Sequence, residues 1–279
     1  MFRCLRWGER ASLPLEVFRD VFDPPSFAIF AVVEEAGGLS ADVLDNSHAL
    51  MGSVNLQQHM QRIKSRSEAL TGRIEKIKSV LPPVMAFKLI PKATCPPCLP
   101  WIDELVRAED APEWVHVYYN ISMAFAFNLL RYAQLRINQV SLIVAKVLSL
   151  PAILQQNYLE AVLSLSMEIC STVAYFISGG QRTLVQMQEN NDVRGFRIFV
   201  ILRYMVAARM GLETATHYGM DTMALSSWLD RVSSGLRQHF GMTVPFGNDP
   251  LRPVGRLWEP DGRDDLAKPF VWSSIAEWA

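Results

Sequence analysis

Cysteine is scarce in this chain of 279 residues, with four copies at positions 4, 95, 98 and 170. Four scattered cysteines do not make the dense disulfide framework of a small secreted protein. The opening stretch MFRCLRWGER also lacks the apolar core that a secretory signal peptide needs. The sequence therefore predicts an intracellular, reducing setting without a signal peptide.

Net charge and long apolar runs are equally sparse. The 27 basic and 28 acidic residues give a formal net charge of −1, so the chain has no overall basic field for gathering phosphates, and direct DNA binding is not expected. A membrane helix needs about 20 predominantly apolar residues. Of the two most apolar stretches, 137–154 is interrupted by Lys146 and Pro151, and 196–206 is short. Both are predicted to be buried core helices, and membrane association through them is the alternative.

Signatures of catalysis are missing as well. The chain has no GxxxxGK[ST] phosphate loop, no GxSxG turn and no HExxH pair. Helical enzymes that ionise prenyl diphosphates hold magnesium with clustered carboxylates, whereas Asp264-Asp265 supplies two acids without a third. No catalytic residue, cofactor, cofactor-binding residue or metal ligand is therefore predicted. A terpene-cyclase-like enzyme of secondary metabolism with an apolar pocket is the alternative hypothesis.

One close cysteine pair stands out, Cys95-Pro96-Pro97-Cys98. A redox motif would follow a thioredoxin-like strand and precede a helix, and half a zinc site would need two further ligands. Neither context is evident, because the other two cysteines are distant and the five histidines are isolated. We interpret the pair as thiols in a proline-rich connector between Pro91 and Pro112, and the role of Cys95 and Cys98 stays open.

What the chain does have is apolar residues, half of the total, at helical spacing. Steps of three and four keep such residues on one side of a helix. This spacing predicts four helices, each with one apolar face. The residues of these faces are Ile121, Phe125, Leu129, Ala133, Ile137, Val140, Val144 and Leu148; Tyr158, Val162, Leu165, Ile169, Val173 and Phe176; Val193, Phe196, Val200, Tyr204, Ala207 and Gly211; and Leu225, Leu229, Val232, Leu236 and Phe240. We expect the structural core around Phe125, Leu129, Ile169, Val173, Phe196 and Val200.

No segment alternates apolar and polar residues for long enough to predict a strand. The sequence therefore predicts an all-α fold, an array of packed antiparallel helices joined as hairpins, with an irregular N-terminal segment and a C-terminal tail. In the helix over 121–148, the polar residues Asn128, Arg131, Gln134 and Asn138 fall largely opposite the apolar face. Pro151 is expected to end that helix, and Gly241 the one that begins near Asp221 or Thr222 and runs to Phe240.

An amphipathic helix is predicted over 55–81, where an apolar stripe includes Met60, Ile63, Leu70, Ile74 and Ile77. Basic residues surround the stripe, so its exposed face is basic. The stripe could make a dimerising coiled coil, and its basic face could meet a polyanion. We favour a helix packed on its own domain, because the repeat covers about three heptads, near the minimum for a coiled coil.

Three regions follow from these patterns. Residues 1–92 form an N-terminal extension that is irregular, with short helices, over its first fifty residues and carries the helix at 55–81. Residues 93–241 form the helical domain. Residues 242–279 form a tail in which Trp258, Phe270, Trp272 and Trp278 alternate with acidic residues. Such a tail resembles activation segments, but we expect its tryptophans to dock on the helical body, since they rarely stay unburied.

Two stretches resemble a known family. They are Tyr118-Tyr119-Asn120 through Asn128-Leu129-Leu130-Arg131-Tyr132, and Ser166-Met167-Glu168-Ile169-Cys170-Ser171-Thr172-Val173-Ala174-Tyr175-Phe176. In order and spacing, with 196–211 and 236–240 after them, they are similar to the C-terminal helical regulatory region of fungal zinc-cluster (Zn2Cys6) transcription factors. Val173-Ala174-Tyr175 stands where that family has a Val-Pro-Tyr-like stretch. The six cysteines of the family's DNA-reading module are not present.

The resemblance implies a non-enzymatic regulator of transcription that lacks its own zinc-cluster module, either a stand-alone regulatory domain or a truncated relative. It implies a nuclear location and a link to a secondary-metabolite gene cluster. Protein partners are expected, through homo- or heterodimer contacts, and a small-molecule effector in the core is compatible with it. The resemblance assigns no functional residue, because the family's helical domain has no catalytic set.

Overall fold

The computed structural model describes residues 20, 23–49, 55–81, 87–178 and 191–242, and at 44–49, 191–196 and 199 it describes the backbone alone. The long elements are all helices, namely α2 (Pro24–Ala49), α3 (Asn55–Val80), α5 (Ile121–Val147), α6 (Ala152–Ile177), α8 (Asn191–His217) and α9 (Met223–Phe240). Shorter elements are α4 (Pro100–Arg107), the 3-10 helix η3 (Lys92–Thr94) and the strands β1 (Lys88–Pro91) and β2 (Trp114–Val117). The predicted all-α class is confirmed.

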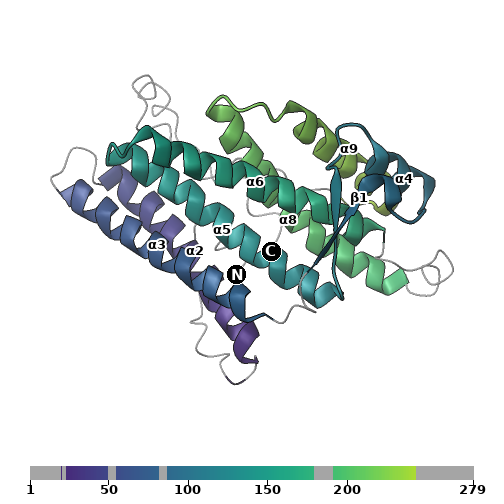
Figure 1. Ribbon diagram of the computed structural model, residues 1–279, viewed down its shortest axis with the longest axis horizontal. Coiled ribbons are helices and arrows are strands. Elements are labelled where there is room, and N and C mark those ends of the chain that lie inside the picture. The colour runs from purple at the N-terminus through teal and green to yellow at the C-terminus, as the bar shows by residue number, and fades with distance from the viewer. Residues whose placement is uncertain (1–19, 21–22, 50–54, 82–86, 179–190, 243–279) are drawn as a thin grey trace.

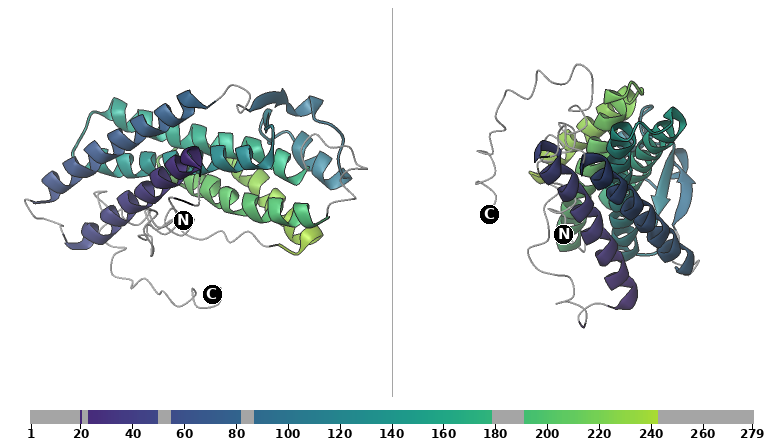
Figure 2. Two further views of the ribbon diagram at one scale, coloured as in Figure 1. Left: turned by 90° about the horizontal axis from the view of Figure 1, so that it is seen from below. Right: turned by 90° about the vertical axis from the view of Figure 1, so that its left-hand side faces the viewer.

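Helix α5 lies at the centre of the array. It contacts α2 and α3 on one side and α6 and α8 on the other. Figures 1 and 2 show the long helices side by side, with β1, β2 and α4 gathered at one end of the bundle. One continuous hydrophobic core runs from Ile29 in α2 to Leu236 in α9. Because α5 is covered on several sides, it is buried around most of its circumference.

Short links make α5 and α6 a helical hairpin. The N–H of Leu150 donates to the carbonyl of Ala145 at 2.8 Å, and Ser149 between them has a positive φ of 51°. This pairing is the Schellman arrangement, in which a left-handed residue lets the chain satisfy the last carbonyls of a helix. Pro151 then precedes α6. The predicted stop at Pro151 is therefore correct, and Gly241, with φ of 66°, ends α9 as expected.

The N-terminal region differs from the prediction, because 24–49 is one helix of 26 residues. Asp23 accepts a hydrogen bond from the N–H of Ser26 at 3.0 Å, and Pro24 opens the helix. An aspartate followed by proline is a good helix start, since proline lacks the N–H that would stay unpaired there. The predicted irregular segment with short helices is therefore wrong over 24–49, although Gly37-Gly38 lies within this helix. Packing overrides the glycines, since Val32, Val33, Ala36, Leu39 and Val43 are all fully buried.

The connector between Pro91 and Pro112 also holds more structure than predicted. Strands β1 and β2 pair antiparallel across it, with Leu89 opposite His116 and Pro91 opposite Trp114. Along the chain, helix α4 comes between the two strands, and it buries Ile102, Leu105 and Val106. Each strand has four residues, too few for an alternating pattern to appear in the sequence.

A third difference concerns the polar side of α5. Asn128, Arg131 and Gln134 were expected opposite the apolar face, yet all three are buried. They still lie off the apolar stripe, but neighbouring elements cover that side of the helix too. Buried polar side chains need hydrogen-bond partners, and the partners of Arg131 form the candidate site.

Candidate functional site

Four side chains from three parts of the chain meet around Arg131, and we call the five residues together the Arg131 cluster. Helix α5 supplies Arg131 and Asn128, β2 and the residue after it supply His116 and Tyr118, and α6 supplies Glu168. The Nε of Arg131 donates to Glu168 Oε2 at 2.8 Å, and its Nη2 donates to His116 Nδ1 at 3.0 Å. Its Nη1 donates to the Tyr118 hydroxyl and to Asn128 Oδ1 at 3.3 Å. One guanidinium thereby joins β2, α5 and α6.

The aromatic ring of Phe87 packs against the cluster. The guanidinium carbon of Arg131 lies 4.7 Å from the centre of the Phe87 ring. Phe87 stacks on His116, with ring centres 4.3 Å apart and planes 15° from parallel. A flat cation against an aromatic face gains a favourable interaction, which is larger where water is excluded. The side chain of Arg131 is 3 % exposed, so the cluster sits in the core.

His116 and Tyr118 of this cluster keep their protonation states near neutral pH. Burial, helped by the charge of Arg131, lowers the pKa of His116 to about 3, so its ring is neutral and accepts at Nδ1. Burial raises the pKa of Tyr118 to about 12, so its phenol keeps its proton. A general acid or base works best with a pKa near the operating pH, and neither group meets that condition. The geometry therefore suits holding elements together rather than transferring protons.

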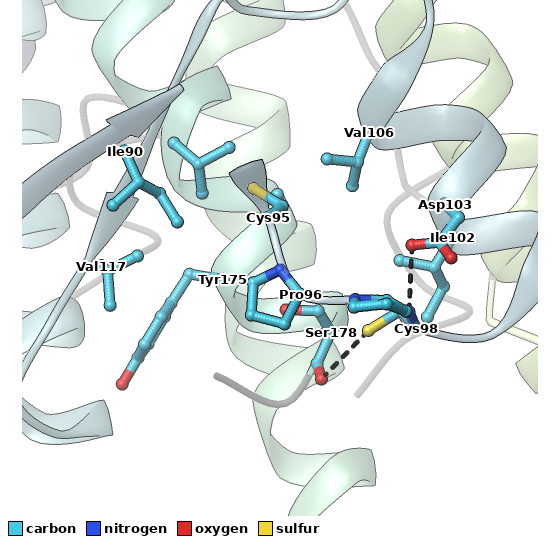
Figure 3. Close-up of a pocket in the computed structure, with 13 residues that line it drawn as sticks. Ile90, Cys95, Pro96, Cys98, Ile102, Asp103, Val106, Val117, Tyr175 and Ser178 are labelled. Carbon is cyan, nitrogen blue, oxygen red and sulfur yellow. Dashed lines mark hydrogen bonds between the residues drawn. The ribbon is translucent and has the colours of Figure 1, made fainter. Parts of the chain in front are cut away.

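Cys95 and Cys98 lie in the loop between η3 and α4. The Cys95 thiol points toward the carbonyl of Pro91 at 3.9 Å, and the Cys98 thiol donates to the carbonyl of Ser178 at 3.6 Å. Both line a small cavity of about 30 Å³, shown in Figure 3 with Tyr175 and other neighbours. Such a space holds about one or two waters, far below the several hundred Å³ of an organic ligand site. Burial raises the pKa of the Cys95 thiol, which lowers its reactive thiolate fraction.

The structure describes the side chains of five of the six residues predicted to form the core. Leu129, Ile169, Val173 and Val200 are buried, and Phe125 is half-buried with its ring edge-on to Tyr204. The side chain of Phe196 lies outside the described residues. These residues face the interior between α5, α6 and α8, and none of the five takes part in the Arg131 cluster.

The apolar stripe of α3 lies against this chain's own α2 and α5. Met60, Ile63, Leu70 and Ile74 are buried there, and Ile77 is half-buried against the same core.

Ion pairs from the surrounding basic residues reinforce the packing of α3. Arg66 pairs with Asp42 and Arg73 with Glu35, both on α2. The stripe is thus occupied within the molecule, and part of the basic charge around it is neutralised by α2.

Metal and membrane features were searched over the same residues. Within the described ranges, no three His, Cys, Asp or Glu side chains come together in a way that could hold a metal ion. Asp264-Asp265 and the tail tryptophans lie outside those ranges. Among the described helices, α6 alone is long and apolar enough to cross a membrane. Its most apolar stretch of 18 residues has a mean hydropathy of 1.4, and 61 % of that stretch is buried. A buried core helix passes the same test, and α6 packs against α5 and α8.

Sequence reasoning missed the Arg131 cluster. It treated His116 as an isolated histidine and placed Arg131 on the polar side of its helix. One signal was available, because Arg131 stands between Leu130 and Tyr132 in a helix whose apolar face is unusually broad. The partners could not be found this way, since Glu168 is 37 residues away along the chain.

No family model, curated protein or solved structure matches this chain.

Proposed function

We propose that this protein is a non-enzymatic regulator of transcription, similar in its helical region to the regulatory domain of fungal zinc-cluster factors. It acts in the nucleus through protein contacts, with DNA targeting supplied by another chain, and belongs to the control of a secondary-metabolite gene cluster. One observation carries the proposal. Tyr118, Asn128 and Arg131 of one stretch that resembles the family, 118–132, meet Glu168 of the other, 166–176, in the Arg131 cluster.

This meeting has a physical meaning. If the two stretches resemble the family because they pack together in its fold, they are expected to contact each other. Here Arg131 joins them by hydrogen bonds to Tyr118 and Glu168. The hydrogen bonds of the cluster hold its side chains in position, and the pKa values of His116 and Tyr118 lie far from the neutral range that suits proton transfer. A rigid helical body with such a tie suits a domain that presents surfaces to other proteins. The terpene-cyclase-like alternative gains no supporting observation from the described residues.

A reporter assay tests the proposal. The full chain is fused to a heterologous DNA-binding module, and transcription is measured from a reporter that carries the matching sites in a yeast host. We expect reporter output to change at least severalfold relative to the module alone, and a fluorescent fusion of the chain to collect in the nucleus.

The comparison is made at equal nuclear amounts of fusion and module. Output equal to that of the module alone would contradict a role in transcription. Exclusion of the fluorescent fusion from the nucleus would contradict the location.

A further inference from the structure

The loop from Cys95 to Pro100 has the backbone of a polyproline II helix at both of its ends. Cys95 has φ −59° and ψ 135°, and Leu99 has φ −64° and ψ 141°, close to the ideal −75° and 145°. Between them Pro96 and Pro97 have φ fixed by their rings. A residue before proline is also driven to extended ψ, and this applies to Cys95, Pro96 and Leu99.

Three residues complete one turn of a polyproline II helix, so residues three apart share an edge. One edge carries Cys95 and Cys98, which are half-buried and face the cavity in Figure 3. A second edge carries Pro97 and Pro100, and both are exposed. Pro96 on the third edge is exposed as well. Pro96 and Pro97 also border the cavity, yet all three prolines are exposed and remain accessible to a partner, whereas the two cysteines are half-buried.

The loop is held in this shape by the rest of the protein. Arg107 donates from Nη1 to the Ala93 carbonyl at 2.9 Å and from Nη2 to the Cys95 carbonyl at 3.0 Å. Asp103 Oδ1 accepts from the N–H of Cys98 at 3.0 Å. Pro100 then starts α4. A ligand segment fixed in its bound shape loses little conformational entropy when a partner binds it.

The same geometry argues against joint chemistry by the two thiols. At 3.1 Å of rise per residue, three steps of polyproline II separate the Cα atoms of Cys95 and Cys98 by about 9 Å. A disulfide needs Cα atoms closer than about 7 Å. Their thiols also point to different carbonyls, of Pro91 and Ser178. The two thiols therefore hold the loop against the body of the protein, and the exposed prolines are left for another role.

We propose that residues 95–100 are a docking segment for a partner domain with an aromatic-lined groove that reads polyproline II. The sequence Pro96-Pro97-Cys98-Leu99-Pro100 contains the PxxP spacing, Pro97 to Pro100, that such grooves accept. The carbonyls of Cys95 and Leu99 accept hydrogen bonds from Arg107 and from α4. The carbonyl oxygens of Pro96 and Pro97 are acceptors of the kind that suit the Trp N–H and Tyr O–H donors of an aromatic groove. The inference does not depend on a role in transcription.

Binding of the full chain to a panel of purified WW and Src-homology polyproline-binding domains tests the proposal. Titration calorimetry should find at least one domain that binds, and the double variant Pro97→Ala/Pro100→Ala should weaken that binding by about tenfold or more. The matched control is Pro151→Ala, which replaces an exposed proline at the start of another helix, α6. It should leave the affinity unchanged within a factor of about two.

A synthetic peptide of residues 92–101 gives a readout that does not depend on folding. It should compete with the full chain for the same groove, and a peptide with both proline changes should not. If no domain in the panel binds the chain, the proposal is overturned. Equal binding by the double variant, or competition by the altered peptide, would also overturn it.

Discussion

Arg131 and Glu168 form an ion pair whose two members stand in different surroundings. The Arg131 side chain is 3 % exposed, whereas that of Glu168 is 42 % exposed. A charge that loses its partner is costly where water cannot reach it. Glu168→Ala leaves a buried guanidinium with neutral partners, while Arg131→Met leaves a carboxylate that water can solvate. The two halves of one pair should therefore contribute unequally.

We expect Glu168→Ala to lower the free energy of unfolding by about 2 to 4 kcal/mol, and Arg131→Met by less. Urea denaturation at pH 7 measures both values. The double variant serves as the control, and it should be no less stable than Glu168→Ala alone, because the uncompensated charge is gone. Equal losses for the two single variants would show that the guanidinium is not desolvated as the structure places it.

His116 makes stability depend on pH. Its pKa falls from 6.5 to about 3 on folding, chiefly through burial and secondly through Arg131. Between these values the unfolded chain binds a proton at His116 and the folded chain does not, so its contribution is complete above pH 6.5 and is lost as pH falls toward 3. The expected slope is up to about 1.4 kcal/mol per pH unit in that window.

His116→Gln should remove most of this slope, since glutamine offers Arg131 an acceptor without titrating. Urea unfolding at pH 7 and pH 5 measures it. Leu129→Ala is the matched control, because a buried truncation lowers stability by about 2 to 5 kcal/mol at both pH values and leaves the slope in place. An unchanged slope in His116→Gln would mean that the acid sensitivity lies elsewhere.

Helix α8 lies close to α5 and α6 at Gly211. A Cβ built there would overlap the Oγ of Ser166 on α6 and lie 2.9 Å from the Cδ1 of Leu135 on α5. The absence of a side chain at this point thus allows the three helices to approach one another. Ser166 is itself fixed, because its hydroxyl donates to the Val162 carbonyl at 2.8 Å.

Gly211→Ala should lower stability by about 1 to 3 kcal/mol, as overpacking does. Thermal unfolding followed by circular dichroism measures the change. Adding Ser166→Ala should restore part of it by removing the overlapping oxygen. Gly72→Ala in α3 is the control, since a Cβ there meets nothing within 4 Å, and it should raise stability by about 0.5 to 1 kcal/mol. A loss at Gly72 equal to that at Gly211 would argue against close packing as the cause.

Sequence periodicity predicts the faces of α5, α6, α8 and α9 because each buries a regular stripe such as Leu129 or Val173. The stop signals at Pro151 and Gly241 are local and equally readable. Helix α2 was missed because Gly37-Gly38 has a low intrinsic helix propensity, which tertiary packing overrides. The strands and the Arg131 cluster depend on residues far apart in the chain, and one sequence does not pair Arg131 with Glu168.

The described helices share one hydrophobic core, which includes residues on both sides of position 92, the predicted boundary between the N-terminal extension and the helical domain. Leu70 and Ile74 of α3 belong to the same buried cluster as Leu129 of α5 and Leu236 of α9. The boundary therefore does not coincide with a break in packing. A core that is continuous in this way is expected to unfold as one cooperative unit.

This continuity predicts how fragments behave. Residues 93–241 alone would expose the side of α5 that α2 and α3 cover, so this fragment should bind the dye ANS, lose near-ultraviolet circular dichroism and melt without a sharp transition. Residues 20–242 retain every described helix and should melt cooperatively, which makes this fragment the control. If 93–241 instead melts sharply at the same temperature as 20–242, the N-terminal helices are an addition to a self-sufficient domain, and the shared core contributes little to stability.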